Sequence, residues 1–146
     1  MYTLSFDIPT GLRQGDNLSP TLFSIFLNDL ATGIKSLNAG ITIDGFNLTI
    51  LLYADDIVLL APSPEKLQKQ IEFIHQWCKK WKMSVNSDKT QIVHFRPKRQ
   101  PLSSFVWKFG NDTLHKVPVY KYLGVYLHHH ISKLWQMLCQ QRRVER

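Results

Sequence analysis

The chain has 146 residues, of which 44% are hydrophobic and 20% are charged, and this is the composition of one globular domain large enough for a hydrophobic core. Its two cysteines, Cys78 and Cys139, lack the spacing of a disulfide framework or a zinc site, which fits a reduced, intracellular setting. Residues 1–12 contain no continuous apolar run of the kind that a secretory leader has. The net charge of +7 divides unevenly, since residues 1–61 have two basic and six acidic side chains (−4) whereas residues 62–146 have sixteen basic and five acidic ones (+11).

This charge division favours a metal-dependent enzyme that acts on a polyanion, because metal ions bind carboxylates and phosphates bind Lys and Arg. The alternative is a generally basic protein with a solvated charged surface.

The first residues predict a strand over 1–10 that stops at Pro9, followed by a loop over 11–17 with two glycines. Gly15 permits close approach of the backbone to a base or sugar. The amide of Gln14 can both donate and accept hydrogen bonds beside a nucleotide. Taken alone, the same residues are also typical of a flexible turn before a helix.

The next element is a helix, with Ser19 as its N-cap and Pro20 as its first residue. The helix is expected to serve as scaffold. Asn28 and Asp29 are expected to face solvent or the loop, without a role in the chemistry. Its apolar residues recur every three or four positions and predict one broad buried face: Leu22, Phe23, Phe26, Leu27, Leu30 and Ile34.

A short hairpin is expected over residues 40–48, with Asp44 and Gly45 in its turn. The apolar run over 50–61 then predicts two buried strands joined by a tight turn near Ala54 and Asp55. This run is too short to span a membrane, which needs about 20 residues, and no membrane partner is expected.

Two adjacent carboxylates, Asp55 and Asp56, lie in the middle of that apolar run. Burying two ionised carboxylates side by side is costly unless positive charge compensates them. Magnesium prefers hard oxygen ligands, so a divalent cation meets this need. The alternative is an ordinary Asp-Asp hairpin turn.

A second helix is predicted after the cap Ser63. Its expected buried stripe is Leu67, Ile71, Ile74, Cys78 and Trp81. The lysines outside the stripe are expected to form a solvated face, and the less favoured alternative is that they contact the phosphates of a nucleic acid. These lysines are Lys66, Lys69, Lys79, Lys80 and Lys82.

Lys89 lies in a turn before a strand predicted over 91–95. A basic connector over 96–101 leads to strands over 105–109, 114–117 and 119–127. The adjacent histidines His128–His130 do not favour a metal site, because neighbouring side chains on a strand or turn rarely converge on one ion. A helix is expected over residues 131–146.

Four blocks together identify a family. Tyr53-Ala54-Asp55-Asp56 resembles the signature of reverse transcriptases, in the wording of the non-LTR, LINE-type retrotransposon group. Three further segments, residues 11–20, 86–90 and 121–125, resemble blocks of that family in the same order. The resemblance covers roughly residues 4–127.

The resemblance implies an α+β fold: an incomplete polymerase palm over residues 1–127, with an antiparallel sheet, two main helices and a C-terminal hairpin like a primer grip. Residues 128–146 would begin a thumb-like region or form an unmatched tail. The implied activity is RNA-directed DNA polymerase by two-metal nucleotidyl transfer.

Implied partners are an RNA template, a DNA primer and deoxynucleoside triphosphates. Asp55 and Asp56 would hold two Mg²⁺ ions, for which Mn²⁺ is a possible substitute, and Lys89 would be the general acid for pyrophosphate. The implied nucleotide and template contacts are Arg13, Gln14 and Gly15, and the implied primer grip is Tyr122, Leu123 and Gly124.

In the resembled family a further catalytic aspartate lies on a central strand that precedes the Gln14-Gly15 loop, and Asp7 is too close to the loop to match it. The expectation is therefore a catalytically incomplete chain that closes the gap in its sheet, aggregates, or needs the missing upstream segment or a partner chain to complete the sheet. The alternatives are a non-catalytic nucleic-acid-binding remnant and a viral RNA-dependent RNA polymerase palm. Tyr-Ala instead of Gly before Asp55, and the Arg13-Gln14-Gly15 loop, argue against the viral palm.

Overall fold

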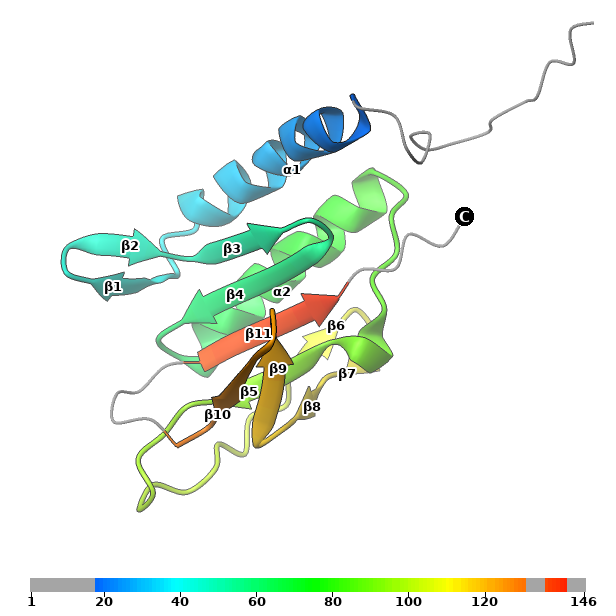
Figure 1. Cartoon of the computed structure of the whole chain (residues 1–146). Coiled ribbons are helices and arrows are strands. Elements are labelled where there is room, and N and C mark those ends of the chain that lie inside the picture. The colour runs from blue at the N-terminus through cyan, green and yellow to red at the C-terminus, as the bar shows by residue number, and fades with distance from the viewer. Residues whose placement is uncertain (1–17, 131–135, 142–146) are drawn as a thin grey trace, which may run out of the picture.

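The computed structural model describes residues 18–130 and 136–141, and it has an α+β architecture (Figure 1). A five-stranded sheet has the order β3-β4-β11-β5-β8, and all its pairs are antiparallel except β5 with β8. These strands are β3 (Ile50–Tyr53), β4 (Asp56–Ala61), β5 (Gln91–His94), β8 (His115–Lys116) and β11 (Gln136–Gln141). The expected α+β class with two main helices is confirmed, whereas its assignment as a polymerase palm stays a prediction.

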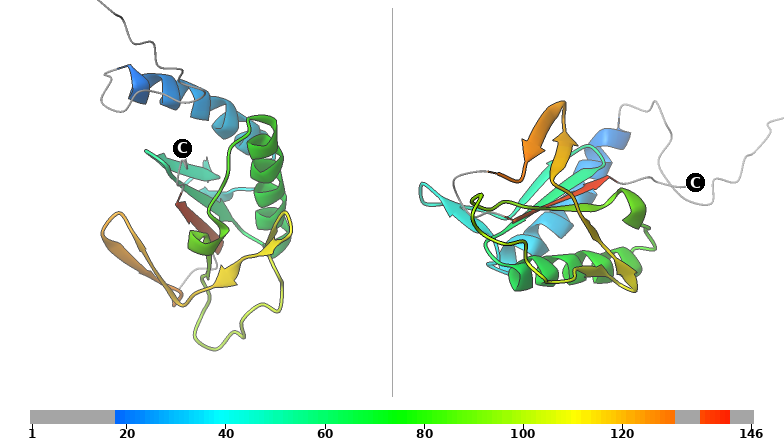
Figure 2. Two further views of the ribbon diagram at one scale, coloured as in Figure 1. Left: turned by 90° about the vertical axis from the view of Figure 1, so that its right-hand side faces the viewer. Right: turned by 90° about the horizontal axis from the view of Figure 1, so that it is seen from below.

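Helices α1 (Ser19–Ser36) and α2 (Pro64–Lys80) lie on the same side of the sheet. Figure 2 shows α2 against the sheet and α1 beside it, along the edge formed by β3. None of the described helices is long and apolar enough to cross a membrane.

Three separate two-stranded hairpins complete the structure, together with a 3₁₀ turn at Ser87–Lys89. They are β1 (Ile41–Ile43) with β2 (Phe46–Leu48), β6 (Lys108–Phe109) with β7 (Asp112–Thr113), and β9 (Val119–Tyr122) with β10 (Val125–His128). The strands expected over 105–109 and 114–117 are thus shorter than predicted, and a turn divides the expected strand 119–127.

Two hairpin turns follow directly from local chemistry. Asp44 and Gly45 have φ values of +48° and +83°, and Leu123 and Gly124 have values of +46° and +84°. Two consecutive positive φ angles define the type I′ turn, whose twist matches the flanking strands. The predicted Asp44-Gly45 hairpin is therefore confirmed.

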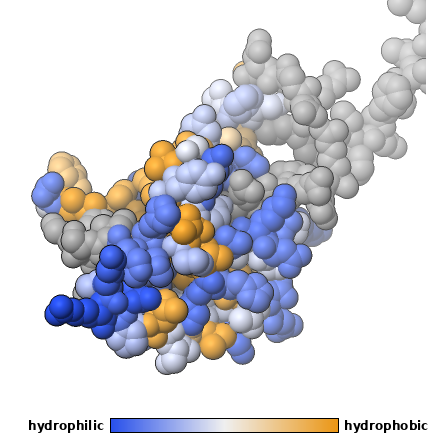
Figure 3. Space-filling model, turned by 60° about the horizontal axis from the view of Figure 1, so that its bottom comes forward, coloured by the Kyte–Doolittle hydropathy of each residue, from blue (hydrophilic) through white to orange (hydrophobic). Residues whose placement is uncertain are grey.

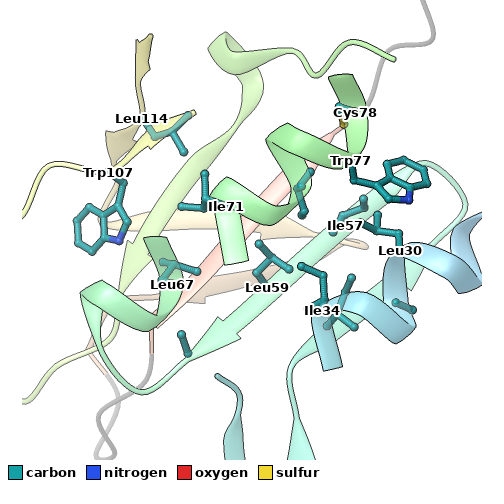
Figure 4. Packing of buried hydrophobic residues seen from close by; sticks show 14 of the residues in the cluster. Leu30, Ile34, Ile57, Leu59, Leu67, Ile71, Trp77, Cys78, Trp107 and Leu114 are labelled. Carbon is teal, nitrogen blue, oxygen red and sulfur yellow. The ribbon is translucent and has the colours of Figure 1, made fainter. Parts of the chain in front are cut away.

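Strand β4 separates two hydrophobic clusters, because successive side chains of a strand point to opposite faces. Ile57 and Leu59 lie in the larger cluster, which the two helices cover (Figure 4). Val58 and Leu60 lie in a smaller cluster on the other face. The β9–β10 hairpin packs on that smaller cluster through Tyr120, Tyr122 and Leu127.

The first helix differs from expectation at both its cap and its stripe. Its N-cap is Leu18, which makes no side-chain capping bond, and the predicted cap Ser19 is the first helical residue. Leu22, expected in the buried face, is 50% exposed, because the packed stripe is formed by residues nearer the C-terminal end. Asp29, expected to face solvent or the loop, accepts a 3.1 Å hydrogen bond from Nε1 of Trp77.

The second helix begins as predicted, since the hydroxyl of Ser63 accepts a hydrogen bond from the backbone N–H of Lys66. Trp81 was expected in its buried stripe but is 44% exposed, whereas Trp77 is 5% exposed. Trp81 lies at the C-cap, after the helical period has ended. Its ring packs on Phe26 and Trp77 at the rim of the core.

The expected C-terminal helix over 131–146 is wrong where the structure describes it, because Gln136–Gln141 form strand β11. β11 pairs with β4 on one side and with β5 on the other. Placement between two strands supplies backbone partners along both edges, and such tertiary context overrides helix propensity. In the described residues, β11 thus occupies the position between β4 and β5.

Candidate metal site and nucleic-acid face

The two carboxylates lie at a tight hairpin between β3 and β4. Tyr53 pairs with Asp56, which leaves Ala54 and Asp55 as the two turn residues. Asp55 is exposed and Asp56 is half-buried. The predicted strand–turn–strand structure is confirmed, although Leu51 and Tyr53 of β3 are more exposed than a buried strand would be.

Ala54 adopts a left-handed backbone conformation with φ of +49°. This conformation costs an L-residue about 1–2 kcal/mol, and glycine adopts it without that penalty. We expect Ala54→Gly to change stability by less than about 1 kcal/mol, in the stabilising direction, because the added flexibility of the unfolded chain offsets part of the gain. Ala54→Val is expected to destabilise by about 1–2 kcal/mol, since β-branched residues avoid positive φ. Denaturant unfolding measures both, and an equal effect of Gly and Val would contradict the prediction.

Electrostatics at the turn disfavour two negative charges. Partial burial raises the pKa of Asp56 above its usual range, and the charge of neighbouring Asp55 adds to the effect. A bound divalent cation would reverse both contributions by favouring the ionised form. The two carboxylates therefore fit a hard cation such as Mg²⁺, although within residues 18–130 and 136–141 no group of three His, Cys, Asp or Glu side chains can hold a metal ion.

This pKa shift predicts a stabilising substitution. Because the folded-state pKa of Asp56 is raised, ionising this carboxyl costs stability as the pH rises through that pKa. We expect Asp56→Asn to raise Tm slightly at pH 7, because solvent screens this partly exposed carboxyl, with the difference vanishing at pH values well below 3.9, where the carboxyl is neutral in both states. The measurement is a thermal melt across pH without metal ions. Asp112→Asn, at an exposed strand position, is the control, and a lower Tm for Asp56→Asn at pH 7 would refute the prediction.

Lys89 lies at the same end of the sheet as the carboxylates. Cys139 of β11 pairs with both Val58 and Gln91, so Gln91 is level with Val58. Lys89, two residues earlier in an exposed 3₁₀ turn, is then near the level of Asp56. One strand separates β4 from β5, which corresponds to about 10 Å.

Asp56 and the β9–β10 hairpin share one face of the sheet. Along β4, Asp56 alternates with Ile57 and therefore belongs with Val58, on the face opposite the helices. Tyr53, its pairing partner, is 60% exposed on the same face. The hairpin projects from this face (Figure 2).

The predicted primer-grip residues occupy the tip of that hairpin. Tyr122 is half-buried against the smaller cluster, while Leu123 is 52% exposed in the turn. A Cβ on Gly124 would meet no atom within 4 Å, so the turn leaves open space there. The predicted nucleotide contacts Arg13, Gln14 and Gly15 lie outside the described residues.

Sequence reasoning missed one pair on this hairpin. Lys121 and Tyr126 are directly opposite in the strand register, and Nζ of Lys121 lies 5.3 Å from the centre of the Tyr126 ring. Tyr126 is 61% exposed. A two-residue turn at Leu123-Gly124 makes these positions partners. The pair could therefore have been predicted from the sequence by recognising that turn.

His129, just after the hairpin, takes part in two backbone hydrogen bonds. The N–H of His129 donates to the carbonyl of Pro118, and the carbonyl of His129 accepts from the N–H of Arg96, both at 2.9 Å. The rings of His129 and His130 are 3.9 Å apart, and the positive charge of the neighbouring side chains adds to the desolvation that lowers the pKa of His129.

Comparison with known proteins places the chain in a family. The model of the family "Reverse transcriptase (RNA-dependent DNA polymerase)" matches residues 5–127. The chain is 32% identical over 126 residues to the RNA-directed DNA polymerase from mobile element jockey of Drosophila funebris, which covers 82% of the chain and 13% of the relative. It is 35% identical over 96 residues to a probable RNA-directed DNA polymerase from transposon BS of Drosophila melanogaster (59% of the chain, 10% of the relative).

A third relative is the retrovirus-related Pol polyprotein from type-1 retrotransposable element R2 of Popillia japonica, 32% identical over 87 residues (59% of the chain, 12% of the relative). The chain thus spans about an eighth or less of the length of these relatives. Because the family match and the named relatives agree with the four sequence blocks, the chain belongs to the reverse transcriptases of non-LTR, LINE-type retrotransposons.

Proposed function

We propose that this chain supplies the metal-binding turn and part of the primer–template surface of an RNA-directed DNA polymerase. The observation that carries the proposal is the Asp55-Asp56 turn, which shares a sheet face with an exposed hairpin and with the aromatic side chain of Tyr53. The proposed partners are an RNA template, a DNA primer and deoxynucleoside triphosphates; the jockey relative is by its name an RNA-directed DNA polymerase.

Asp55 and Asp56 are the residues that would hold Mg²⁺, with Mn²⁺ as a substitute. When bound, a pair of such ions neutralises charge on the attacking and leaving oxygens of nucleotidyl transfer. The carboxylates contribute charge and position: the tight turn fixes them side by side, and the strand β4 anchors them through buried residues.

Lys89 is proposed to donate a proton or positive charge to the departing pyrophosphate. Its exposed position at the same end of the sheet as the carboxylates is compatible with this role. Tyr122, Leu123 and Gly124 would lie against the primer end, and Arg13, Gln14 and Gly15 against the nucleotide and template.

The described carboxylate pair should bind metal weakly on its own. Two carboxylates from one turn leave much of the coordination shell of a divalent cation to water. We therefore expect Mn²⁺ to bind this chain with a Kd above about 100 μM, as measured by the free-ion signal in electron paramagnetic resonance. Micromolar binding that Asp55→Asn abolishes would show that the site is already complete and would refute this expectation.

The activity test uses nucleotide incorporation on an RNA template. Residues 5–127 replace the matching segment of the Drosophila funebris jockey polymerase, and this chimera is compared with the chain alone. The proposal expects incorporation by the chimera that requires a divalent cation and both aspartates. Incorporation that survives the double substitution Asp55→Asn with Asp56→Asn would disprove it.

A second candidate is a nucleic-acid-binding module without catalysis. The net charge of +11 over residues 62–146 is what favours it. Duplex binding that needs no metal, in a chimera that incorporates no nucleotide, would decide for this alternative.

A further inference from the structure

Strands β4 and β5 both end on the side of the sheet that lies away from the carboxylates. Ala61 of β4 and His94 of β5 are level with each other, because both pair with the same position of β11. Along β4, the distance from Asp56 to Ala61 corresponds to about 17 Å. The end of the sheet at His94 is therefore the end opposite to the candidate metal site (Figure 1).

Basic side chains from three segments meet at this opposite end. The N–H of Arg96, on the connector after β5, donates at 2.9 Å to the carbonyl of His129, which follows the β9–β10 hairpin. The charges of Arg96, His129 and Lys116 of β8 all act on His94, the last residue of β5. We call this group the histidine cluster, and its members are His94, Arg96, Lys116, His128, His129 and His130.

The histidine cluster has no compensating negative charge. Desolvation, followed by the charges of the surrounding side chains, lowers the pKa of both His94 and His129. Every charged neighbour that contributes to these two shifts is an Arg, Lys or His of the cluster, and no carboxylate among the described residues contributes to either. The cluster therefore favours a bound anion.

Two members of the cluster are held by the loop that follows the connector. The ammonium of Lys116 donates to the carbonyl of Ser103 at 2.8 Å, and Nδ1 of His94 accepts from the N–H of Ser103 at 3.4 Å. Arg96 differs from them. One of its guanidinium nitrogens donates to the carbonyl of Gln100, whereas its Nε is buried without an acceptor among the described residues. This guanidinium has donors that the described residues leave unused, and a buried donor without an acceptor is costly.

The three consecutive histidines are accessible from solvent. His128 and His130 are exposed and His129 is half-buried, with its ring 3.9 Å from that of His130. Histidine is the side chain that gains positive charge as the pH falls from about 8 to about 5. Protonation adds charge beside Arg96, so an anion and a proton favour the binding of each other here.

We propose that the histidine cluster binds a phosphate group through Arg96 and the rings of His128–His130, and that this binding takes up protons. Phosphate oxygens are strong acceptors, and a guanidinium presents donors in the geometry that they need. Free phosphate and the backbone of a nucleic-acid strand both carry this group. The inference rests on charge and hydrogen bonding at the far end of the sheet, and it does not depend on the proposed polymerase function.

NMR of the histidine rings in the unsubstituted full chain tests the site directly. The pH is titrated without ligand, with inorganic phosphate and with a short single-stranded oligothymidylate. We expect at least one of the two ligands to raise the pKa of His129, while that of His115, which lies outside the cluster, stays unchanged. An effect of inorganic phosphate shows recognition of the free ion, and an effect of the oligothymidylate alone identifies a strand as the source.

The role of Arg96 is tested by Arg96→Gln, which keeps the backbone N–H that donates to His129. Without ligand, this substitution is expected to raise the pKa of His129, because it removes a neighbouring positive charge. It should also weaken ligand binding at least about threefold. A lower pKa for His129, or unchanged ligand binding, would contradict the assignment of Arg96 to the site.

The ligand that raises the pKa should also bind more tightly at low pH. We expect its affinity to rise at least about tenfold from about pH 7.5 to about pH 5.5, and less than about threefold in the chain with His128→Gln and His130→Gln. The matched control is His75→Gln with His115→Gln, which removes two histidines outside the cluster and should leave the tenfold rise intact.

Two outcomes would overturn the proposal. If neither ligand changes the pKa of His129 in the unsubstituted chain, the cluster is not a phosphate site, and this result does not depend on the folding of any variant. If both pairs of substitutions reduce the pH dependence equally, net charge alone accounts for it and the cluster has no special part in binding.

Discussion

Replacing Asp55 by Asn is expected to lower the rate of nucleotide incorporation by about 10³-fold or more in the chimera with the jockey polymerase. Asn keeps the shape of the side chain and removes its charge, and phosphoryl transfer depends mainly on charge stabilisation and positioning. Asp55 is the exposed member of the pair, at the tip of the turn, so its substitution disturbs little packing. Asp56→Asn should have an equal or smaller effect. Primer extension at saturating nucleotide and template measures both rates.

Lys89 provides an internal comparison for the same experiment. If Lys89 acts as a general acid, Lys89→Ala should lower incorporation by about 10²–10⁴-fold. Lys82→Ala, an exposed lysine after α2, is the control and should change the rate little. A loss below tenfold for Asp55→Asn would remove the basis for placing the metal at this turn.

Features governed by a few neighbouring residues could be predicted from the sequence. The Asp44-Gly45 turn follows from the ease with which these residues adopt positive φ. The cap at Ser63 follows from its hydroxyl and the proline after it. The Asp55-Asp56 hairpin follows from the apolar strands on either side of the carboxylates.

Features that depend on distant partners were not predicted. Residues 131–146 have a composition compatible with a helix, but β11 forms because β4 and β5 present two open edges. Trp77 rather than Trp81 is buried because α1 packs beside the former and offers Asp29 as a hydrogen-bond acceptor. Neither partner can be identified from local periodicity.

The candidate site combines both kinds of information. Sequence identified the carboxylate pair, while the alternation along β4 showed that Asp56 shares a face with the β9–β10 hairpin. Exposed basic residues lie on several different elements. Lys66 and Lys69 are exposed on α2, whereas Lys121 lies on the hairpin and Lys98 and Arg99 on the exposed connector that follows β5.

A surface suited to nucleic acid combines positive charge with exposed aromatic or apolar groups. Strongly hydrophilic and hydrophobic groups alternate on the surface when the lower end of the molecule is brought forward (Figure 3). Lys121 stacked over the exposed ring of Tyr126 is one such combination. This arrangement predicts which lysines contact phosphates and which do not.

Binding of an RNA–DNA primer–template duplex should therefore weaken steeply with salt. A protein that neutralises six to ten phosphates loses about 10³–10⁵ in affinity between 50 and 200 mM salt. We expect this chain to lose about 10³-fold over that range, and the combined substitutions Lys98→Ala, Arg99→Ala and Lys121→Ala to reduce the slope of log K against log salt by about one for each contact removed. The measurement is fluorescence anisotropy of a labelled duplex at several salt concentrations.

The matched control for this prediction is Lys66→Ala with Lys69→Ala, which removes exposed charge from α2 on the helix side of the sheet. Its slope should remain close to that of the unsubstituted chain, because general electrostatic attraction decays within a Debye length of about 8–10 Å and direct phosphate contacts dominate the slope. Equal effects of the two sets of substitutions would show that net charge alone governs binding. An affinity that stays flat with salt would exclude phosphate contacts altogether, and with them the assignment of the hairpin face to the duplex.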